Sequence, residues 1–305
     1  MKAAIYTKRS SGKVLELVEI DPPLPKAGEV LIRVRAASVN PLDWRLKSHR
    51  PGVDVAGEIT SVGTGVARLK PGDPVFGLGK GTFAEFAVAR ESRLAAMPDG
   101  VSFEDAASLP IAGLTALQGL RDRGKLAPGQ TVLINGASGG IGTFAVQIAK
   151  TMGAEVTGVC STRNVELVRS LGADFVFDYT REDFAQGAKR YDLILDNAAS
   201  RTLSDFRRVM TPSGRCVLAG APKKGGEILS RTSDALIRLC ILRQKFVFFI
   251  ALPRLKDLES LATLVQTGKM HPVIDRQYPL SEAGAAIAYV EEGHARGKVI
   301  ISPTQ

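Results

Sequence analysis

The chain has 305 residues, a length that indicates two domains. Its content of 45% hydrophobic and 23% charged residues is ordinary for a soluble globular protein with a sizeable core. The first residues lack the apolar segment of a signal peptide, and no stretch reaches about 18 uncharged apolar residues. The three cysteines, Cys160, Cys216 and Cys240, are scattered, which indicates a reducing compartment and no disulfide framework. We therefore expect a cytoplasmic protein without a membrane span.

Positive charge is concentrated in one part of the chain. Residues 201–256 hold 12 Lys or Arg against 3 Asp or Glu, which accounts for the whole net charge of +9. Such a region either attracts an anionic cofactor or acidic partner, or is simply a solvated basic face. Nucleic acid is not expected, because no recognition motif or interleaved aromatic pattern accompanies the charge.

The first hundred residues have the texture of a β-rich domain. Short strands separated by Gly- and Pro-rich turns indicate a small barrel or sandwich. The expected strands are residues 2–7, 15–20, 29–37, 53–62, 73–77 and 83–88. A helix is expected to begin after Ser102, an N-cap with Asp105 three residues later, and to continue past Pro110 to Leu120.

A glycine-rich bend follows the next strand, residues 131–134, and leads into a helix over residues 143–150. It reads Gly136-Ala-Ser-Gly-Gly-Ile-Gly142. Such a bend aims backbone N–H groups and the positive end of a helix dipole at one point, which suits a diphosphate. Gly139 would let the backbone approach the phosphates, and Gly142 would let helix and strand pack closely.

Strands and helices alternate after this bend, which predicts an α/β doubly wound parallel sheet with its ligand at the carboxyl ends of the strands. The expected strands are 155–160, 174–178, 191–196 and 215–219, and the helices are 164–171 and 203–210. The second strand is followed by Ser161-Thr-Arg-Asn164, with no acid before Glu166. Hydroxyls and the Arg163 guanidinium suit a ribose 2′-phosphate, so we predict NADPH rather than NADH. The alternative is that Arg163 only caps the turn in water.

The last part of the chain begins with two apolar segments, 235–242 and 245–252. We interpret the second as a late strand of the sheet or a strand paired across a homodimer interface. The alternative is weak association with a membrane surface. Helices over 253–266 and 281–292, the latter capped by Ser281, and strands over 273–278 and 298–302 are expected to return to the first domain.

Several motifs together resemble the medium-chain dehydrogenase/reductase superfamily, in particular its zinc-free, zeta-crystallin-like quinone oxidoreductase branch. The chain is most similar to chloroplast-envelope quinone oxidoreductase homologues and reticulon-interacting mitochondrial reductases. The resemblance implies a GroES-like domain, residues 1–114 with 256–305, and a Rossmann domain, residues 115–255. It also implies NADPH-dependent hydride transfer to quinones or to the C=C bond of α,β-unsaturated carbonyls. The motifs are Ser38-Val-Asn-Pro-Leu-Asp-Trp44, Asp54-Val-Ala-Gly-Glu58, Leu109-Pro-Ile-Ala-Gly-Leu-Thr-Ala116, Asn135–Gly142, Leu171-Gly-Ala-Asp174, Asp196-Asn197 and Gly293-His-Ala-Arg-Gly-Lys298.

The resemblance also implies site residues. Asn40 would line the substrate cleft, with a mere turn residue before Pro41 as the alternative. Tyr179 and His294 have the alternative of being ordinary surface residues. The cofactor-binding set comprises Ser138, Gly139, Gly140 and Ile141 at the diphosphate, Ser161 with Arg163 at the 2′-phosphate, Tyr179 at the adenosine, Asn197 at the nicotinamide, and the tail residues His294, Ala295 and Arg296.

A zinc site is not expected, because the first hundred residues contain no cysteine and only one histidine, His49. A short-chain dehydrogenase is excluded, because none of the five tyrosines is followed four residues later by lysine. No side chain stands out as a proton donor, which leaves water for that role. The segment between Trp44 and Asp54 is shorter than the resemblance implies, which would either open the cleft to bulkier enones or quinones or remove activity. An NADPH-binding sensor or scaffold without turnover is therefore the alternative function.

Overall fold

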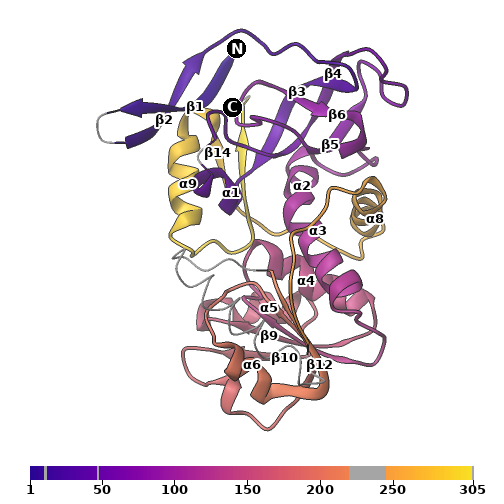
Figure 1. Cartoon of the computed structure of the whole chain (residues 1–305), viewed down its shortest axis with the longest axis vertical. Helices are drawn as coiled ribbons and strands as arrows, with labels where there is room; N and C mark the ends of the chain where they lie inside the picture. Colours follow the sequence, from indigo (N-terminus) through magenta and orange to yellow (C-terminus); the bar gives the residue numbers. More distant parts are fainter. Residues whose placement is uncertain (10–11, 47, 220–244, 304–305) are drawn as a thin grey trace. The chain divides into compact units, whose positions relative to one another are not determined.

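The computed structural model describes residues 1–9, 12–46, 48–219 and 245–303. They form two compact units, Met1–Leu114 with Leu252–Gln305 and Thr115–Ala251 (Figure 1). The predicted apolar segment 235–242 and Cys240 lie outside the described residues. Within the described ranges, no helix is long and apolar enough to cross a bilayer.

The first unit is built on β-sheet. A hairpin of β1 and β2 is followed by a seven-stranded sheet in the order β14-β15-β3-β4-β5-β7, with β6 also paired to β3. The last strand, β15, pairs antiparallel with β3 through Ile301 and Ala37, so the end of the chain does return to this unit. The strands are β1 Lys2–Arg9, β2 Gly12–Glu19, β3 Glu29–Ser38, β4 Asp54–Val62, β5 Pro74–Leu78, β6 Phe86–Arg90, β7 Leu94–Ala96, β14 Ile274–Pro279 and β15 Lys298–Ser302.

Short helices complete this unit, and two sequence signals for their starts had opposite outcomes. The predicted cap at Ser102 is confirmed, because its side chain accepts a 3.0 Å hydrogen bond from the Asp105 amide. The predicted cap at Ser281 is wrong, because a 3₁₀ turn comes first and Glu282 takes the cap position. Buried Leu280 and Ala283 fix that turn by packing. The helices are α1 Pro41–Arg45, α2 Phe103–Ser108, α8 Leu255–Gln266 and α9 Ala283–Glu291. Helix α3, Pro110–Gln118, contains the boundary between the two units at Leu114.

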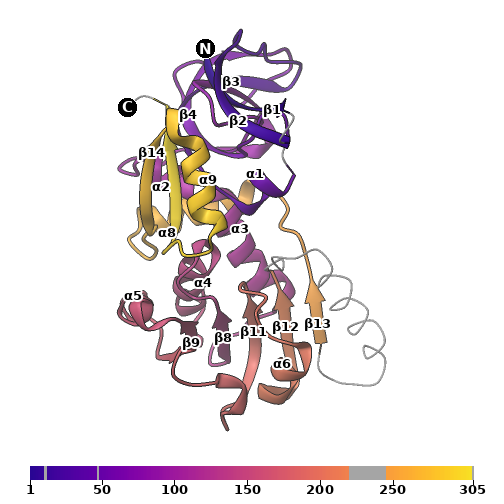
Figure 2. The same cartoon turned by 90° about the vertical axis from the view of Figure 1, so that its left-hand side faces the viewer.

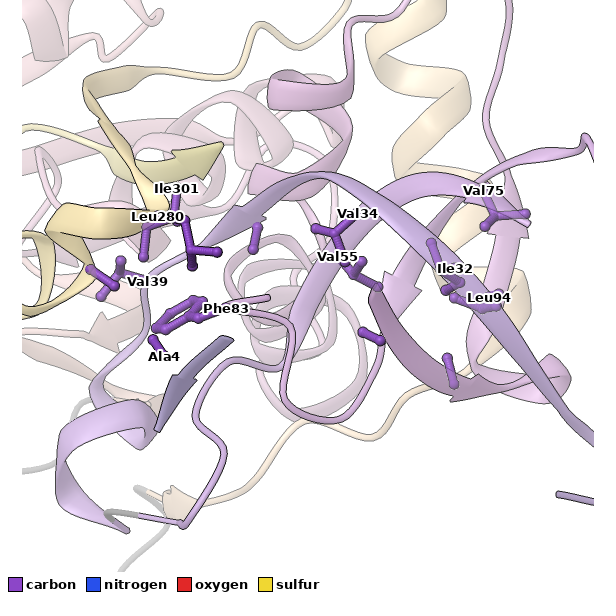
Figure 3. Close-up of a cluster of buried hydrophobic side chains, with 14 of the residues drawn as sticks. Ala4, Ile32, Val34, Val39, Val55, Val75, Phe83, Leu94, Leu280 and Ile301 are labelled. Carbon is purple, nitrogen blue, oxygen red and sulfur yellow. The ribbon is translucent and has the colours of Figure 1, made fainter. Parts of the chain in front are cut away.

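The core of the first unit follows from alternation along β3. Val30, Ile32 and Val34 are fully buried at every second position, as expected for a strand with one face on the core. They belong to a single apolar cluster (Figure 3), in which Phe83 lies at one end near Ala4. The single tryptophan of the chain, Trp44, packs against the same cluster.

The second unit contains the predicted doubly wound sheet. All five pairings are parallel, and the order β10-β9-β8-β11-β12-β13 corresponds to 3-2-1-4-5-6 in chain order. Figure 2 shows β9, β8, β11, β12 and β13 in this order. The direction of winding changes between β8 and β11, which is where such sheets bind ligands. The elements are β8 Thr131–Asn135, α4 Gly140–Thr151, β9 Glu155–Cys160, α5 Val165–Ser170, β10 Phe175–Asp178, β11 Tyr191–Asp196, α6 Leu203–Val209, β12 Met210–Leu218 and β13 Lys245–Phe248.

Replacing Phe83 by alanine should lower the free energy of unfolding of the first unit by about 3–5 kcal/mol, because a large ring that is 1% exposed leaves a cavity. Urea unfolding followed by the fluorescence of Trp44 measures this. Leu24→Ala, at a side chain that is 85% exposed, is the control and should change stability by less than about 0.5 kcal/mol. Equal effects of the two substitutions would contradict the assignment of the core.

Candidate functional site

The glycine bend joins β8 to α4 as predicted. Gly136 has φ +82°, a conformation that favours glycine, and its amide donates to the Val159 carbonyl at 3.2 Å. The Ala137 amide donates to the same carbonyl at 3.0 Å. The end of the first parallel strand is thereby fixed to its neighbour β9, and the chain then turns into the helix at Gly139.

Two glycines in the bend meet different surroundings. A Cβ on Gly142 would lie 2.1 Å from the Gly136 carbonyl oxygen, so the helix approaches the bend too closely for any side chain. A Cβ on Gly139 would meet only that same oxygen at 3.6 Å, an ordinary contact. The fold therefore requires glycine at position 142 but leaves space at position 139, as expected where a ligand approaches the backbone.

Asn164 joins the bend to the end of β9, a role that the sequence did not indicate. Its Nδ2 donates to Ser138 Oγ at 3.0 Å and to Ser161 Oγ at 3.3 Å. The side chain is 5% exposed, and its Oδ1 is buried without a hydrogen-bond partner. The two serines predicted to meet different phosphates are therefore held by one amide.

The turn after β9 is hydrogen-bonded to an acid that the local sequence did not show. Asp178, at the end of neighbouring β10, accepts hydrogen bonds from Thr162 Oγ1 at 2.6 Å and from Thr180 Oγ1 at 2.7 Å. The hydrogen bond from Thr162 is the main cause that lowers the pKa of this carboxyl. Arg163 is exposed on the same turn, and Tyr179 is 58% exposed directly after β10.

A polar cluster lies at the carboxyl ends of β8 and β11. Asn135 Nδ2 donates to Asp196 Oδ1 at 2.9 Å, and the backbone N–H of Asn197 donates to the backbone carbonyl of Asn135 at 3.0 Å. Both polar atoms of the Asn197 side chain are buried without a partner. A buried primary amide in this state is costly unless a ligand supplies both a donor and an acceptor. A carboxamide such as that of nicotinamide would satisfy both atoms.

Asn40 lies in a buried polar network of the first unit. Its Nδ2 donates to Asp54 Oδ2 at 2.8 Å, and its Oδ1 accepts from Lys298 Nζ at 2.8 Å. Lys298 Nζ also lies 3.6 Å from Asp54 Oδ2, and Ser38 Oγ donates to the same oxygen at 2.7 Å. Asn40 is 2% exposed, so both ends of its amide are already engaged within the protein. Its contact with a substrate stays a prediction.

A second buried acid stands beside this network. Asp43 accepts hydrogen bonds from the amides of Asn40, at 2.7 Å, and Gly52, at 3.0 Å. Burial raises its pKa to about 7, and the Asp54 carboxylate adds to that effect, against the hydrogen bonds and the Lys298 ammonium. Lys298 therefore faces two carboxyl groups, and near neutral pH one of them holds a proton for part of the time.

The tail residues are found in the first unit. Ala295 packs against its core, the Arg296 amide donates to Asp275 Oδ2 at 2.9 Å, and His294 is exposed. Their part in cofactor binding stays a prediction, as does that of Gly140 and Ile141 at the start of α4. Across the described ranges, no group of three or more His, Cys, Asp or Glu is placed to hold a metal ion.

Comparison with known proteins agrees with this architecture. The strand order and the bend at its switch point define a Rossmann-type unit. A model of the alcohol dehydrogenase GroES-like domain matches residues 26–99, and a model of the zinc-binding dehydrogenases matches residues 171–301. The quinone oxidoreductase of Coxiella burnetii superposes with a TM-score of 0.86, at 28% identity and with 99% of each chain covered.

Two plant proteins are similar over the whole chain. The chloroplast envelope quinone oxidoreductase homologue of Arabidopsis thaliana is 36% identical, covering 99% of this chain and 98% of the relative. The chloroplastic NADPH-dependent alkenal/one oxidoreductase of the same plant is 32% identical, covering 99% and 80%. The chain belongs to the medium-chain dehydrogenase/reductase family, in its quinone oxidoreductase branch. The resemblance and the fold class predicted from the motifs are thereby confirmed.

Asp43 should make the stability of the first unit depend on pH. Its pKa is raised from 3.8 to about 7, so between these values the folded chain holds a proton that the unfolded chain has lost. Stability should therefore fall as pH rises through this window, by about 1.4 kcal/mol per pH unit. Asp43→Asn removes the titration, so the difference in unfolding free energy between wild type and variant should change by roughly 2–3 kcal/mol between pH 5 and 8.

Urea unfolding at the two pH values, followed by Trp44 fluorescence, tests this expectation. Asp99→Asn, at an exposed acid of the same unit, is the control and should follow the wild type at both values. Parallel pH curves for the wild type and Asp43→Asn would contradict the assigned protonation.

Proposed function

We propose that this protein is an NADPH-dependent reductase that transfers hydride to quinones or to the C=C bond of α,β-unsaturated carbonyls without zinc. The observation that carries the proposal is the switch-point edge of the parallel sheet. There a bend with space at Gly139 lies at the end of β8, and the unpaired amide of Asn197 follows β11. The names of the relatives, quinone oxidoreductase and alkenal/one oxidoreductase, support this substrate class.

The preference for NADPH is supported by the turn after β9. Ser161 and Arg163 offer a hydroxyl and a guanidinium, which suit a 2′-phosphate. An acid that receives the ribose 2′-hydroxyl would favour NADH. Asp178, at the end of β10, accepts hydrogen bonds from Thr162 and Thr180. The proposed preference therefore rests on the Ser161 hydroxyl and the Arg163 guanidinium of this turn.

In the proposed mechanism, the bound dihydronicotinamide supplies the hydride, and the residues of the chain orient it. The Asn197 amide would hold the carboxamide of the nicotinamide through both of its polar atoms. Ser138 and the amides at the start of α4 would hold the diphosphate, helped by the helix dipole. A quinone or enone is already electrophilic, and water would donate the proton that the reduced acceptor must gain. The absence of zinc rests on the donor set, since residues 1–114 contain no cysteine and a single histidine.

The remaining assignments belong to the same proposal. Residues 1–114 with 256–305 would form the substrate-binding, GroES-like domain, and residues 115–255 the NADPH-binding domain. Asn40 would lie at the substrate, and His294 to Arg296 would reach the cofactor. We also propose a cytoplasmic homodimer.

The purified protein should oxidise NADPH in the presence of at least one acceptor from a panel of 1,4-quinones and alkenals, because its site is arranged for cofactor and needs no metal. Loss of absorbance at the nicotinamide band measures turnover, with and without a zinc chelator. Turnover should be unchanged by the chelator. Tight NADPH binding without turnover on any acceptor would favour a sensor or scaffold and contradict the enzyme.

Gly139→Ala should leave the fold intact and weaken NADPH binding by at least about tenfold, because its methyl group occupies the space left for a phosphate. Gly142→Ala is the matched variant and should instead destabilise the second unit, because its methyl group would meet the Gly136 carbonyl at 2.1 Å. Thermal unfolding and titration calorimetry separate the two effects. Unchanged affinity in Gly139→Ala would argue that the phosphates do not lie at the bend.

A further inference from the structure

We infer that Asn164 is a positioning residue for the cofactor: its amide holds Ser138 and Ser161 so that both hydroxyl groups point their hydrogens at phosphate oxygens. The inference rests on the proposed NADPH site, and it adds a residue that orients the two serine hydroxyl groups of that site. It begins from the two hydrogen bonds donated by Asn164 Nδ2, at 3.0 Å to Ser138 and 3.3 Å to Ser161.

The direction of these hydrogen bonds is what matters. A serine hydroxyl has one hydrogen to donate and two lone pairs that accept. Because the primary amide donates one of its two hydrogens to each serine, each hydroxyl acts as an acceptor there and keeps its own hydrogen. Within the described residues neither hydroxyl donates a hydrogen bond. Both are therefore set to donate to an anion, and donors to phosphate form stronger hydrogen bonds than neutral pairs do.

The ordinary role of asparagine at this position does not explain its side chain. Asn164 is the N-cap of α5, where its oxygen would normally accept from a backbone amide of the first turn. No such hydrogen bond is present, and Oδ1 is buried without a partner. The side chain is turned toward the serines instead, at the expense of the helix cap.

The two serines follow two adjacent strands of the parallel sheet. Ser138 belongs to the bend after β8, and Ser161 follows β9. A diphosphate at the bend and a 2′-phosphate at the end of β9 would thus be bound by hydroxyls that share one buried anchor. Replacing Asn164 should therefore weaken the binding of the diphosphate and of the 2′-phosphate together.

The experiment is a calorimetric titration of three probes into wild type and variants: NADPH, ADP-ribose for the diphosphate, and adenosine 2′,5′-bisphosphate for the 2′-phosphate. Asn164→Ala should lower the affinity for each probe by about tenfold. Asn164→Asp should weaken NADPH by about a hundredfold, because a carboxylate accepts the serine hydrogens and repels the phosphates. A loss confined to one of the two fragments would overturn the shared anchor.

A second background separates positioning from folding. In the double variant Ser138→Ala/Ser161→Ala, adding Asn164→Ala should lower the affinity for NADPH by less than about twofold, because the hydroxyl groups that Asn164 orients are gone. A full tenfold loss in that background would show a merely structural role and overturn the inference. Gln147→Ala removes another buried amide of the unit, one that donates to the Thr143 carbonyl in its own helix, and should leave the affinities unchanged.

The outcomes also distinguish this inference from the proposed function. A wild-type chain that binds none of the probes would contradict the cofactor itself. Wild-type binding of NADPH together with unchanged affinity in Asn164→Asp would leave the cofactor standing and overturn only the role of Asn164, since it would mean that the serines donate to residue 164. Thermal unfolding midpoints within a few degrees of wild type confirm that each variant is folded.

Discussion

The structure of the second unit depends on the close backbone contact between helix α4 and the bend that follows strand β8. With no side chain at Gly142, the first turn of the helix lies against the backbone of Gly136, and a methyl group there would meet the carbonyl oxygen at 2.1 Å. That approach determines where the helix begins, and hence where its amides point. The position of Ser138, the space at Gly139 and the contact with Asn164 all follow from it.

The first unit contains buried charged side chains that must be compensated. Lys298, Asp54 and Asp43 are each at most 3% exposed, and such groups are tolerated only when they are paired and hydrogen-bonded. Lys298 and Asp54 compensate each other, with Asn40 bonded to both. The second carboxyl, Asp43, is left to titrate near neutrality. The residues involved come from β3, α1, β4 and β15, so the network connects segments that are far apart in the sequence.

The sequence predicted what short-range patterns determine. The bend, the five parallel strands over residues 131–219 that alternate with helices, and the Ser102 cap all depend on residues within a few positions of one another. What it could not show depends on contacts between distant segments. Ser281 resembles a cap, but the packing of Leu280 decides where α9 begins. Asp178 lies 15 residues beyond Arg163 and reaches the same turn only because β10 pairs with β9. Nothing in the sequence shows the contact of Asn164 with Ser138. The resemblance placed Asn197 at the nicotinamide, but the sequence does not show that its side-chain amide is unpaired.

The place of β15 in its sheet determines the order in which the protein can be completed during synthesis. This strand lies between β14 and β3, yet it follows every other described element in the sequence. The described strands of the parallel sheet all fall within residues 131–248, so that sheet can form while the chain is still being translated. The N-terminal strands, although made first, wait for residues 298–302 before β3 gains this neighbour and the charges of Asp54 and Lys298 meet. Until then, β3 lacks this neighbour, and an unpaired strand edge of this kind is prone to aggregation.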